Sequence, residues 1–100
     1  MNILYLNLKA KWYEMIESGI KKEEYREIKP YWIKRLCVSY SEDVSSIEYK
    51  EYDAVKFIYG YTKRSMMFNI QEILVDTGKP EWGAEEEIKY FVIRLGERIE

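Results

Sequence analysis

The chain has 100 residues, the usual length of one domain, and we expect residues 1–100 to form a single domain. Its apolar fraction of 47% is too high for a disordered chain, and no run approaches the roughly 18 apolar residues that span a bilayer. With one cysteine and no histidine, an internal disulfide, His- or multi-Cys metal sites and imidazole catalysis are excluded. The opening MNILYLNLK lacks a signal-peptide pattern. We therefore expect a cytoplasmic protein without metal, cofactor or membrane partner.

Charge is unevenly distributed along the chain. The net charge is −2, but residues 1–36 carry +3 and residues 37–100 carry −5. An acidic protein with a local basic segment suits a small anionic ligand or a short nucleic-acid segment better than long duplex DNA. The basic excess comes mainly from Lys21, Lys22, Arg26, Lys29, Lys34 and Arg35.

The spacing of the apolar residues predicts the first two elements. Residues 3–8 alternate leucine with other residues, which predicts a strand. From Ala10 the apolar spacing becomes i, i+3, i+4, which predicts a short helix. Gly19 is expected to end this helix, because glycine adopts the left-handed conformation after a helix without penalty.

The charged segment 21–27 that follows is predicted to be a strand. In a helix, Lys22 would face Arg26 and Glu23 would face Glu27, which are two like-charge pairs. In a strand, Glu24 and Arg26 share one face, and Tyr25 lies on the other face.

The remaining pattern predicts five more segments. In chain order they are a helix from Pro30, a surface loop at 39–51, a hairpin of strands 53–61 and 66–75, a loop at 76–87, and a buried strand at 88–95. Cys37 and four aromatic residues on the apolar faces are interpreted as core: Trp12, Phe57, Phe68 and Phe91. The fold class is α+β, a small β-barrel or curved mixed sheet of about five strands with two short helices at its mouth.

The charged strand has two interpretations. Proteins commonly place charges on an edge strand to prevent aggregation. Alternatively, Lys21, Glu24 and Arg26 line a cleft, where they supply a proton carrier, a hydrogen-bond acceptor and a bidentate anion clamp.

The spacing of Gly19, Lys21, Glu24 and Arg26 resembles the G-x-K-x-x-E-x-R signature of ASCH domains, which are small β-barrels similar to the PUA fold. The segments LYLNLKAKWYEMIESG, PYW, the GY turn, EWGA and YFVIRLG extend the resemblance along almost the whole chain. It implies a cleft beside the first helix, where the signature Lys, Glu and Arg bind RNA or a nucleotide.

The resemblance also implies a possible enzyme. Some ASCH proteins are amidohydrolases that deacetylate N4-acetylcytidine with a Lys, a Thr and a Glu. Lys21 matches the Lys, Glu24 occupies the Thr position, and Glu81 in the loop before the last strand is the candidate Glu. The implied variant uses Glu24 or Glu81 to orient water. Ribonuclease activity is a further alternative that the family suggests.

The favoured hypothesis is a domain that binds RNA, a nucleoside or a nucleotide, as a monomer or weak dimer. Lys21 would contact phosphate or carbonyl oxygen, Glu24 would accept from an exocyclic amine, and Arg26 would clamp phosphate or a base edge. The alternatives are the amidohydrolase and a protein-interaction module. Further candidates are aromatic residues for base stacking and basic residues that extend the charged face: Tyr25, Tyr59, Tyr61, Trp82, Lys63 and Arg64.

Overall fold

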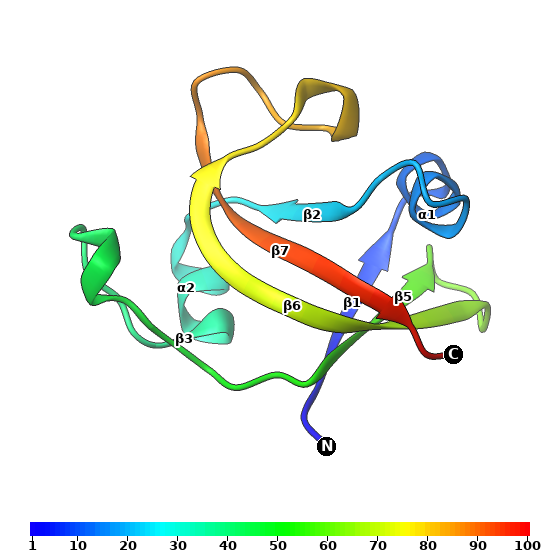
Figure 1. Ribbon diagram of the computed structural model, residues 1–100, viewed down its shortest axis with the longest axis horizontal. Helices are drawn as coiled ribbons and strands as arrows, with labels where there is room; N and C mark the ends of the chain where they lie inside the picture. The colour runs from blue at the N-terminus through cyan, green and yellow to red at the C-terminus, as the bar shows by residue number, and fades with distance from the viewer.

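The computed structural model describes residues 1–100 as an α+β fold with one main five-stranded sheet that curls into a half-barrel (Figure 1). Neither helix has the length and apolarity that a membrane crossing requires. The elements in chain order are β1 (Ile3–Leu8), α1 (Ala10–Glu17), β2 (Glu23–Arg26), α2 (Pro30–Leu36), β3 (Cys37–Ser39), the 3₁₀ turn η1 (Val44–Ser46), β4 (Glu48–Tyr49), β5 (Ala54–Tyr59), β6 (Ser65–Thr77), the 3₁₀ turn η2 (Pro80–Trp82) and β7 (Lys89–Arg98).

The main sheet is mixed and has two free edges. Its strand order is β1-β5-β6-β7-β2, with β1 parallel to β5 and all other neighbours antiparallel. The edge strands β1 and β2 do not pair with each other. The half-barrel therefore has an open seam between β1 and β2.

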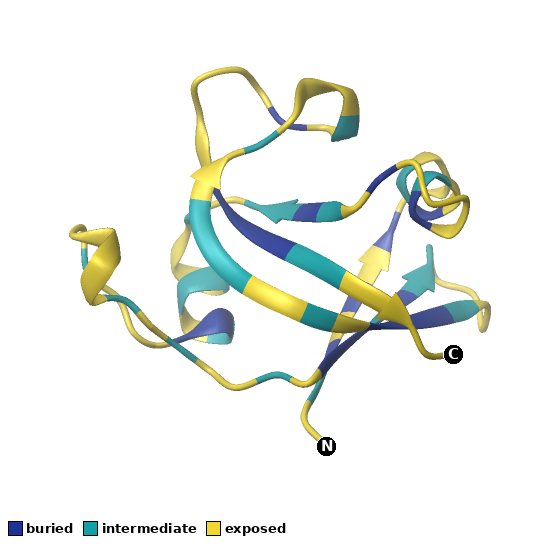
Figure 2. Cartoon of the chain, in the orientation of Figure 1, coloured by how far each residue is buried: buried dark blue, intermediate teal, exposed yellow.

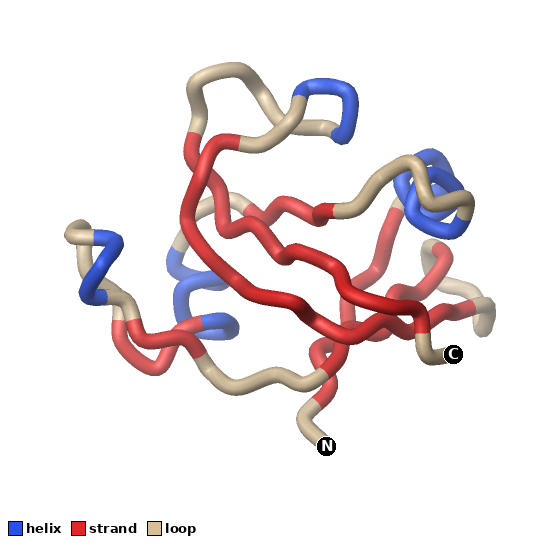
Figure 3. Tube along the Cα trace, viewed as in Figure 1, coloured by secondary structure: helices blue, strands red, loops and turns tan.

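The curl of the sheet comes largely from β6, which is 13 residues long. Its first part pairs with β5 and the rest pairs with β7, with register shifts on either side of Ile70. Bulges of this kind bend a strand and increase its twist. Figure 3 shows the resulting arc, which carries β7 and β2 back over β1.

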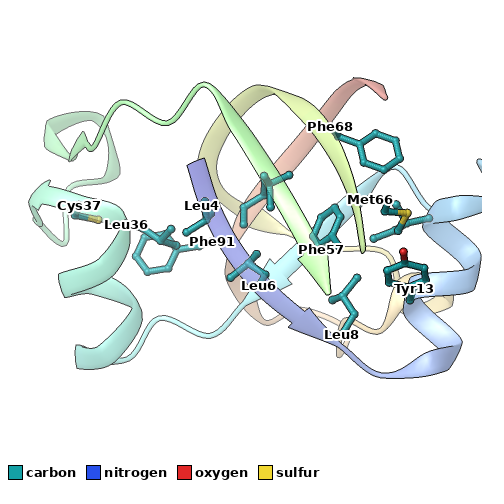
Figure 4. Close-up of a cluster of buried hydrophobic side chains, with 13 residues drawn as sticks. Leu4, Leu6, Leu8, Tyr13, Leu36, Cys37, Phe57, Met66, Phe68 and Phe91 are labelled. Carbon is teal, nitrogen blue, oxygen red and sulfur yellow. The ribbon is translucent and has the colours of Figure 1, made fainter. Parts of the chain in front are cut away.

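The core fills the inside of this curl. Leu4, Leu6 and Leu8 point inward from β1, between Leu36 and Phe91 at one end and Tyr13 and Met66 at the other (Figure 4). Buried residues lie along the strands, and most connecting loops are exposed (Figure 2). Each helix thus closes one end of the core, as the amphipathic patterns predict.

The expected core residues are mostly confirmed, with one correction. Cys37, Phe57, Phe68 and Phe91 are buried. Trp12, which we expected in the core, is only half-buried, and its place on the inner face of α1 is taken by Tyr13. Ile16 of the same helix is buried as its spacing predicts, so the difference concerns the first turn, where the sequence pattern alone does not say which of two adjacent aromatic residues faces the sheet.

The expected loop at 39–51 is also more ordered than predicted. Cys37 and Ser39 pair with Tyr49 and Glu48 in a small antiparallel ladder, which stands apart from the main sheet. The ladder is anchored by Tyr49, which packs against the core. The sequence did not predict this ladder, because two paired residues in each strand are too few to show an alternation of apolar and polar residues.

The prediction of a strand after the first helix is confirmed, but the strand is shorter than expected. Gly19 has φ +85°, which fits its expected role as the end of α1. β2 begins at Glu23 and pairs with β7, so that Glu24 lies opposite Ile93. Lys21 precedes the strand, and its side chain therefore does not follow the strand alternation.

Candidate functional site

Three charged side chains form a continuous chain of ion pairs beside the open seam. The Glu24 carboxylate lies 3.0 Å from Lys21 Nζ through Oε1 and 2.6 Å from Arg26 Nη2 through Oε2. The side chains of Lys21, Glu24 and Arg26 are only 2%, 8% and 18% exposed. The sequence therefore predicted a real cluster, which is more deeply buried than a charged edge strand would be.

Local backbone structure brings these groups together. Glu24 and Arg26 are two residues apart on β2, so both side chains point to the same face. After the turn at Gly19, the Lys21 backbone N–H donates to Met15 O at 3.0 Å. This bond fixes Lys21 against the end of α1, with its side chain directed toward Glu24.

The Lys21 ammonium is surrounded by protein groups. It donates to the Trp82 backbone carbonyl at 2.5 Å and lies 4.7 Å and 5.2 Å from the ring centroids of Trp12 and Tyr25. A cavity of about 90 Å³ remains beside it, bordered also by Glu24. Lys21 is thus held by a carboxylate, a carbonyl and two aromatic faces, and does not face solvent.

Burial changes the protonation chemistry of this amine. Desolvation lowers the pKa of Lys21 from its ordinary value of 10.5, and the adjacent Glu24 carboxylate opposes the shift. The direction is downward because removal from water penalises the charged form. Lys21 therefore loses its proton at a lower pH than a lysine in water does.

The loop of residues 78–88 closes this enclosure, and Tyr25 holds the loop in place. The Tyr25 hydroxyl donates to Glu23 Oε1 at 2.8 Å and accepts from the Lys79 backbone N–H at 2.9 Å. A Cβ at Gly78 would lie 2.7 Å from the Tyr25 ring, so only glycine allows this approach. Burial is also the main cause that raises the pKa of Tyr25, which keeps its hydroxyl protonated.

A cavity of about 430 Å³ lies in the open seam, and Glu24 and Arg26 form part of its lining. Trp12 and Trp32 line it as well. The Arg26 guanidinium stacks over Trp32 at 4.9 Å, and its Nη2 donates to Asn7 O at 3.3 Å as well as to Glu24. Its Nη1 makes no hydrogen bond within the chain, and its Nε is buried without a hydrogen-bond partner. Arg26 is therefore the member of the charged cluster that presents free donors to the cavity.

The structure brings together some of the predicted site residues and separates others. Tyr25 and Trp82 lie around Lys21, as described above. Glu81 is exposed and forms no ion pair or hydrogen bond with Lys21. The remaining candidates lie at the β5–β6 turn, away from both cavities: Tyr59, Tyr61, Lys63 and Arg64.

At that turn, Arg64 is held by residues of α1 and β5. Arg64 donates to Glu17 of α1 at 2.7 Å, and its guanidinium lies over the rings of Tyr13 and Tyr59. Tyr61 and Lys63 are exposed. The turn is thus attached to α1 through Tyr13 and Glu17 and does not extend the seam cavity.

Sequence reasoning missed several residues that line the cavity. Asn7 and Lys9 come from the end of β1, and Trp32 comes from α2. Trp12 was interpreted as a core residue, and the two basic residues of α2, Lys34 and Arg35, were noted only for their charge. The signal that was available is the aromatic residue near the start of each helix, on either side of the charged strand.

No group of three or more His, Cys, Asp or Glu side chains lies close enough together to hold a metal ion. Comparisons with protein-family models, with curated proteins and with solved structures found no match to this chain.

Proposed function

We propose that this protein is an ASCH-type, PUA-like domain that binds single-stranded RNA or a modified nucleoside in the cavity of the open seam. The observation that carries the proposal is the buried Lys21–Glu24–Arg26 cluster, whose outer member opens into a cavity bordered by two tryptophans. Its volume of about 430 Å³ falls within the ~300–1,000 Å³ typical of small-molecule sites.

The energetic cost of the cluster supports a role beyond folding. Charges buried in a pair are often no more stabilising than apolar residues of the same volume, because each ion loses its hydration. Charged groups that are desolvated beside a cavity occur preferentially at functional sites. A cluster of three such groups in a domain of 100 residues is therefore better explained by ligand recognition than by stability.

Each residue has a distinct role in the proposed complex. Arg26 supplies the free guanidinium donors for a phosphate or for the acceptor edge of a base. Glu24 orients Arg26 and has lone pairs left to accept from an exocyclic amine, since a carboxylate accepts about four hydrogen bonds. Lys21 neutralises Glu24 from the interior, and so it acts by positioning and not by touching phosphate.

Binding is tested by titrating the protein with cytidine, N4-acetylcytidine, cytidine monophosphate and short single-stranded RNAs, using intrinsic tryptophan fluorescence. Arg26→Ala should weaken binding on the order of tenfold or more, because it removes charge-assisted hydrogen bonds. Glu24→Gln should retain binding of phosphate-bearing ligands. The control is Arg64→Ala, which removes the same charge outside the cavity and should leave affinity unchanged. Absence of binding by all of these ligands would refute the proposal.

A second candidate function is an amidohydrolase that acts on N4-acetylcytidine. The observation that favours it is the desolvated Lys21 amine, with its lowered pKa, 3.0 Å from Glu24 and beside the small inner cavity. An amine and a carboxylate in contact can pass a proton to and from an attacking water and a leaving amine. In this version Glu24 acts as the base, because Glu81 lies apart from Lys21.

The two functions are separated by chromatographic detection of cytidine released from N4-acetylcytidine. For an amidohydrolase, Glu24→Gln should reduce turnover by about 10²–10⁴-fold while nucleoside affinity changes little, because a positioned acid or base acts mainly on the rate. Glu81→Gln should have no effect. If the wild-type protein binds N4-acetylcytidine but releases no cytidine, the protein is a binding domain.

A further inference from the structure

We propose that the seam site continues past Arg26 into a second cavity, and that the ligand is consequently single-stranded RNA of two or more nucleotides and not a free nucleoside. This inference rests on the function proposed above, and it specifies the substrate class. The second cavity has a volume of about 410 Å³ and lies between β1 and α2. Tyr31, Trp32 and Arg35 of α2 line one side of it.

The two cavities form one groove because they share lining residues. Asn7, Arg26 and Trp32 border both of them. The first cavity runs from this shared point toward Trp12 and α1, and the second runs along β1 toward Tyr5. Since β1 is an edge strand with no partner on this side, the groove follows the open seam.

Two guanidinium groups are fixed along the same strand edge. Arg35 Nη2 donates to Tyr5 O at 2.6 Å, and Arg26 Nη2 donates to Asn7 O at 3.3 Å. These carbonyls are two residues apart on β1, which corresponds to about 7 Å. Each guanidinium has five donors, so each keeps donors for a ligand after this bond. Their positions are set before binding, which reduces the entropic cost of ordering them.

The second cavity also offers an aromatic surface. Tyr31 is 63% exposed, and its ring packs edge-on against Trp32 with a centroid distance of 4.8 Å. The Arg26 and Arg35 guanidinium groups lie 4.9 Å and 5.5 Å from the Trp32 centroid. The Trp32 ring is therefore covered by the two guanidinium groups and by Tyr31, and it holds them in place. Tyr31 is the ring that is available to stack a base.

The charge of the groove favours a polyanion with planar groups. Its cations are Lys9, Arg26 and Arg35, whereas Glu24 is neutralised by Lys21 and Glu27 pairs with Lys29. The two guanidinium groups of Arg26 and Arg35 can bind phosphates, and the exposed Tyr31 ring beside them can stack a base, as single-stranded RNA requires. An acidic peptide would use the cations but not the aromatic surface.

The test compares ligand lengths on the intact protein. Cytidine monophosphate, a dinucleotide and an eight-nucleotide single-stranded RNA are titrated by tryptophan fluorescence, with an equally charged poly-glutamate peptide as competitor. Arg35→Ala and Tyr31→Ala should each weaken binding of the RNAs on the order of 5- to 100-fold and leave mononucleotide affinity within twofold. Lys34→Ala is the matched control, because Lys34 is an exposed basic residue of the same helix that does not line the groove. Thermal unfolding of each variant checks that the fold is retained.

The outcomes distinguish this inference from the function on which it rests. Affinity that rises from mononucleotide to dinucleotide, and that depends on Arg35 and Tyr31, supports the two-cavity groove. Mononucleotide binding with equal affinity for longer RNA would overturn the groove and leave the proposed function standing. Equal competition by poly-glutamate would identify a general acidic-ligand site and overturn the RNA assignment. If none of the nucleotides binds, both proposals fail.

Discussion

At the scale of single residues, the charged cluster shows three degrees of enclosure. Lys21 is sealed by its neighbours, Glu24 is nearly so, and Arg26 reaches the cavity. A buried charge that loses its partner is expensive, whereas a partly exposed one regains hydration. We therefore expect that the more enclosed residue of the cluster contributes more to the free energy of unfolding.

We predict that Lys21→Ala destabilises the fold more than Arg26→Ala does. Lys21→Ala removes the most enclosed member of the cluster together with its hydrogen bond to Trp82 O and its contacts with Trp12 and Tyr25, and loss of one partner of a buried pair costs ~3–5 kcal/mol. Arg26→Ala leaves Glu24 paired with Lys21, and the loss of a hydrogen bond to a charged group costs ~1.5–3 kcal/mol. The free energy of unfolding is measured by urea denaturation.

The exposed pair of Arg64 and Glu17 provides the comparison for this series. Glu17→Ala should cost no more than ~1 kcal/mol, as is usual for a surface ion pair. A loss below ~0.5 kcal/mol for both Lys21→Ala and Arg26→Ala would mean that the cluster is solvated like an ordinary charged edge strand.

At the scale of elements, the site depends on the contact between β2 and the loop of residues 78–88. Tyr25 of β2 hydrogen-bonds the Lys79 N–H, and Gly78 lies directly against its ring. The loop in turn supplies the Trp82 carbonyl to Lys21. The loop and the strand therefore enclose Lys21 together, although they are far apart in the sequence.

We predict that Gly78→Ala opens this enclosure. The added Cβ would lie 2.7 Å from the Tyr25 ring and 2.7 Å from Ala84 Cβ, and relief of such overpacking costs ~1–3 kcal/mol. Displacement of the loop should expose the Lys21 amine. The measurement is the rate at which an acylating reagent modifies Lys21, followed by mass spectrometry.

Gly60→Ala is the control for this variant. Gly60 also has a positive φ, at the β5–β6 turn, but a Cβ there would meet nothing within 4 Å. That variant should lose a comparable amount of stability through backbone strain without changing the reactivity of Lys21. Equal reactivity of Lys21 in both variants and the wild type would show that the loop does not seal the site.

At the scale of the whole molecule, the open seam leaves two connected cavities between the edge strands and α2. The half-barrel buries the inner faces of its strands, and its helices close the two ends of the core. Side chains of β1, β2 and α2 line the cavities in the seam between the two edge strands. Three of the basic residues of this chain, whose net charge is −2, line the cavities at the seam: Lys9, Arg26 and Arg35.

We predict that RNA binding is moderately salt-dependent and that this dependence comes from the seam. Each lost phosphate contact lowers the slope of log K against log salt by roughly 0.7 for a single strand. Arg26→Ala should therefore reduce the slope by about this amount. The slope is obtained from fluorescence titrations at several salt concentrations.

In the same titrations, Arg64→Ala should leave the slope unchanged, because Arg64 pairs with Glu17 outside the groove. An equal reduction in the two variants would mean that RNA is held by the basic surface in general and not by the seam.

The fold could be predicted from local signals to a large extent. The period of two over 3–8, the helical spacing after Ala10, the like-charge argument for 21–27 and the apolar run at 88–95 each predicted an element that the structure contains. These elements have strong patterns because one face, or both faces, must be apolar. The β3–β4 ladder was missed because a two-residue strand has no period to detect.

The candidate site could be predicted only in part. The proximity of Glu24 and Arg26 follows from strand geometry, and the structure also brings Lys21 to Glu24. The interpretation of Tyr59, Tyr61, Lys63 and Arg64 as part of the same face was based on residue type, and the structure places them at the β5–β6 turn. Residue type does not report distance between elements.

By itself the sequence determined the α+β class, the helix end at Gly19 and the shared face of Glu24 and Arg26, because these depend on interactions within a few residues. Only the tertiary structure decided the depth of Lys21, the closure by residues 78–88 and the joining of β1, β2 and α2 around one groove. Burial and strand order result from contacts between distant segments, and these depend on how the whole sheet curls. The same charged residues would be solvated on a flat sheet edge and are enclosed at the seam of a half-barrel.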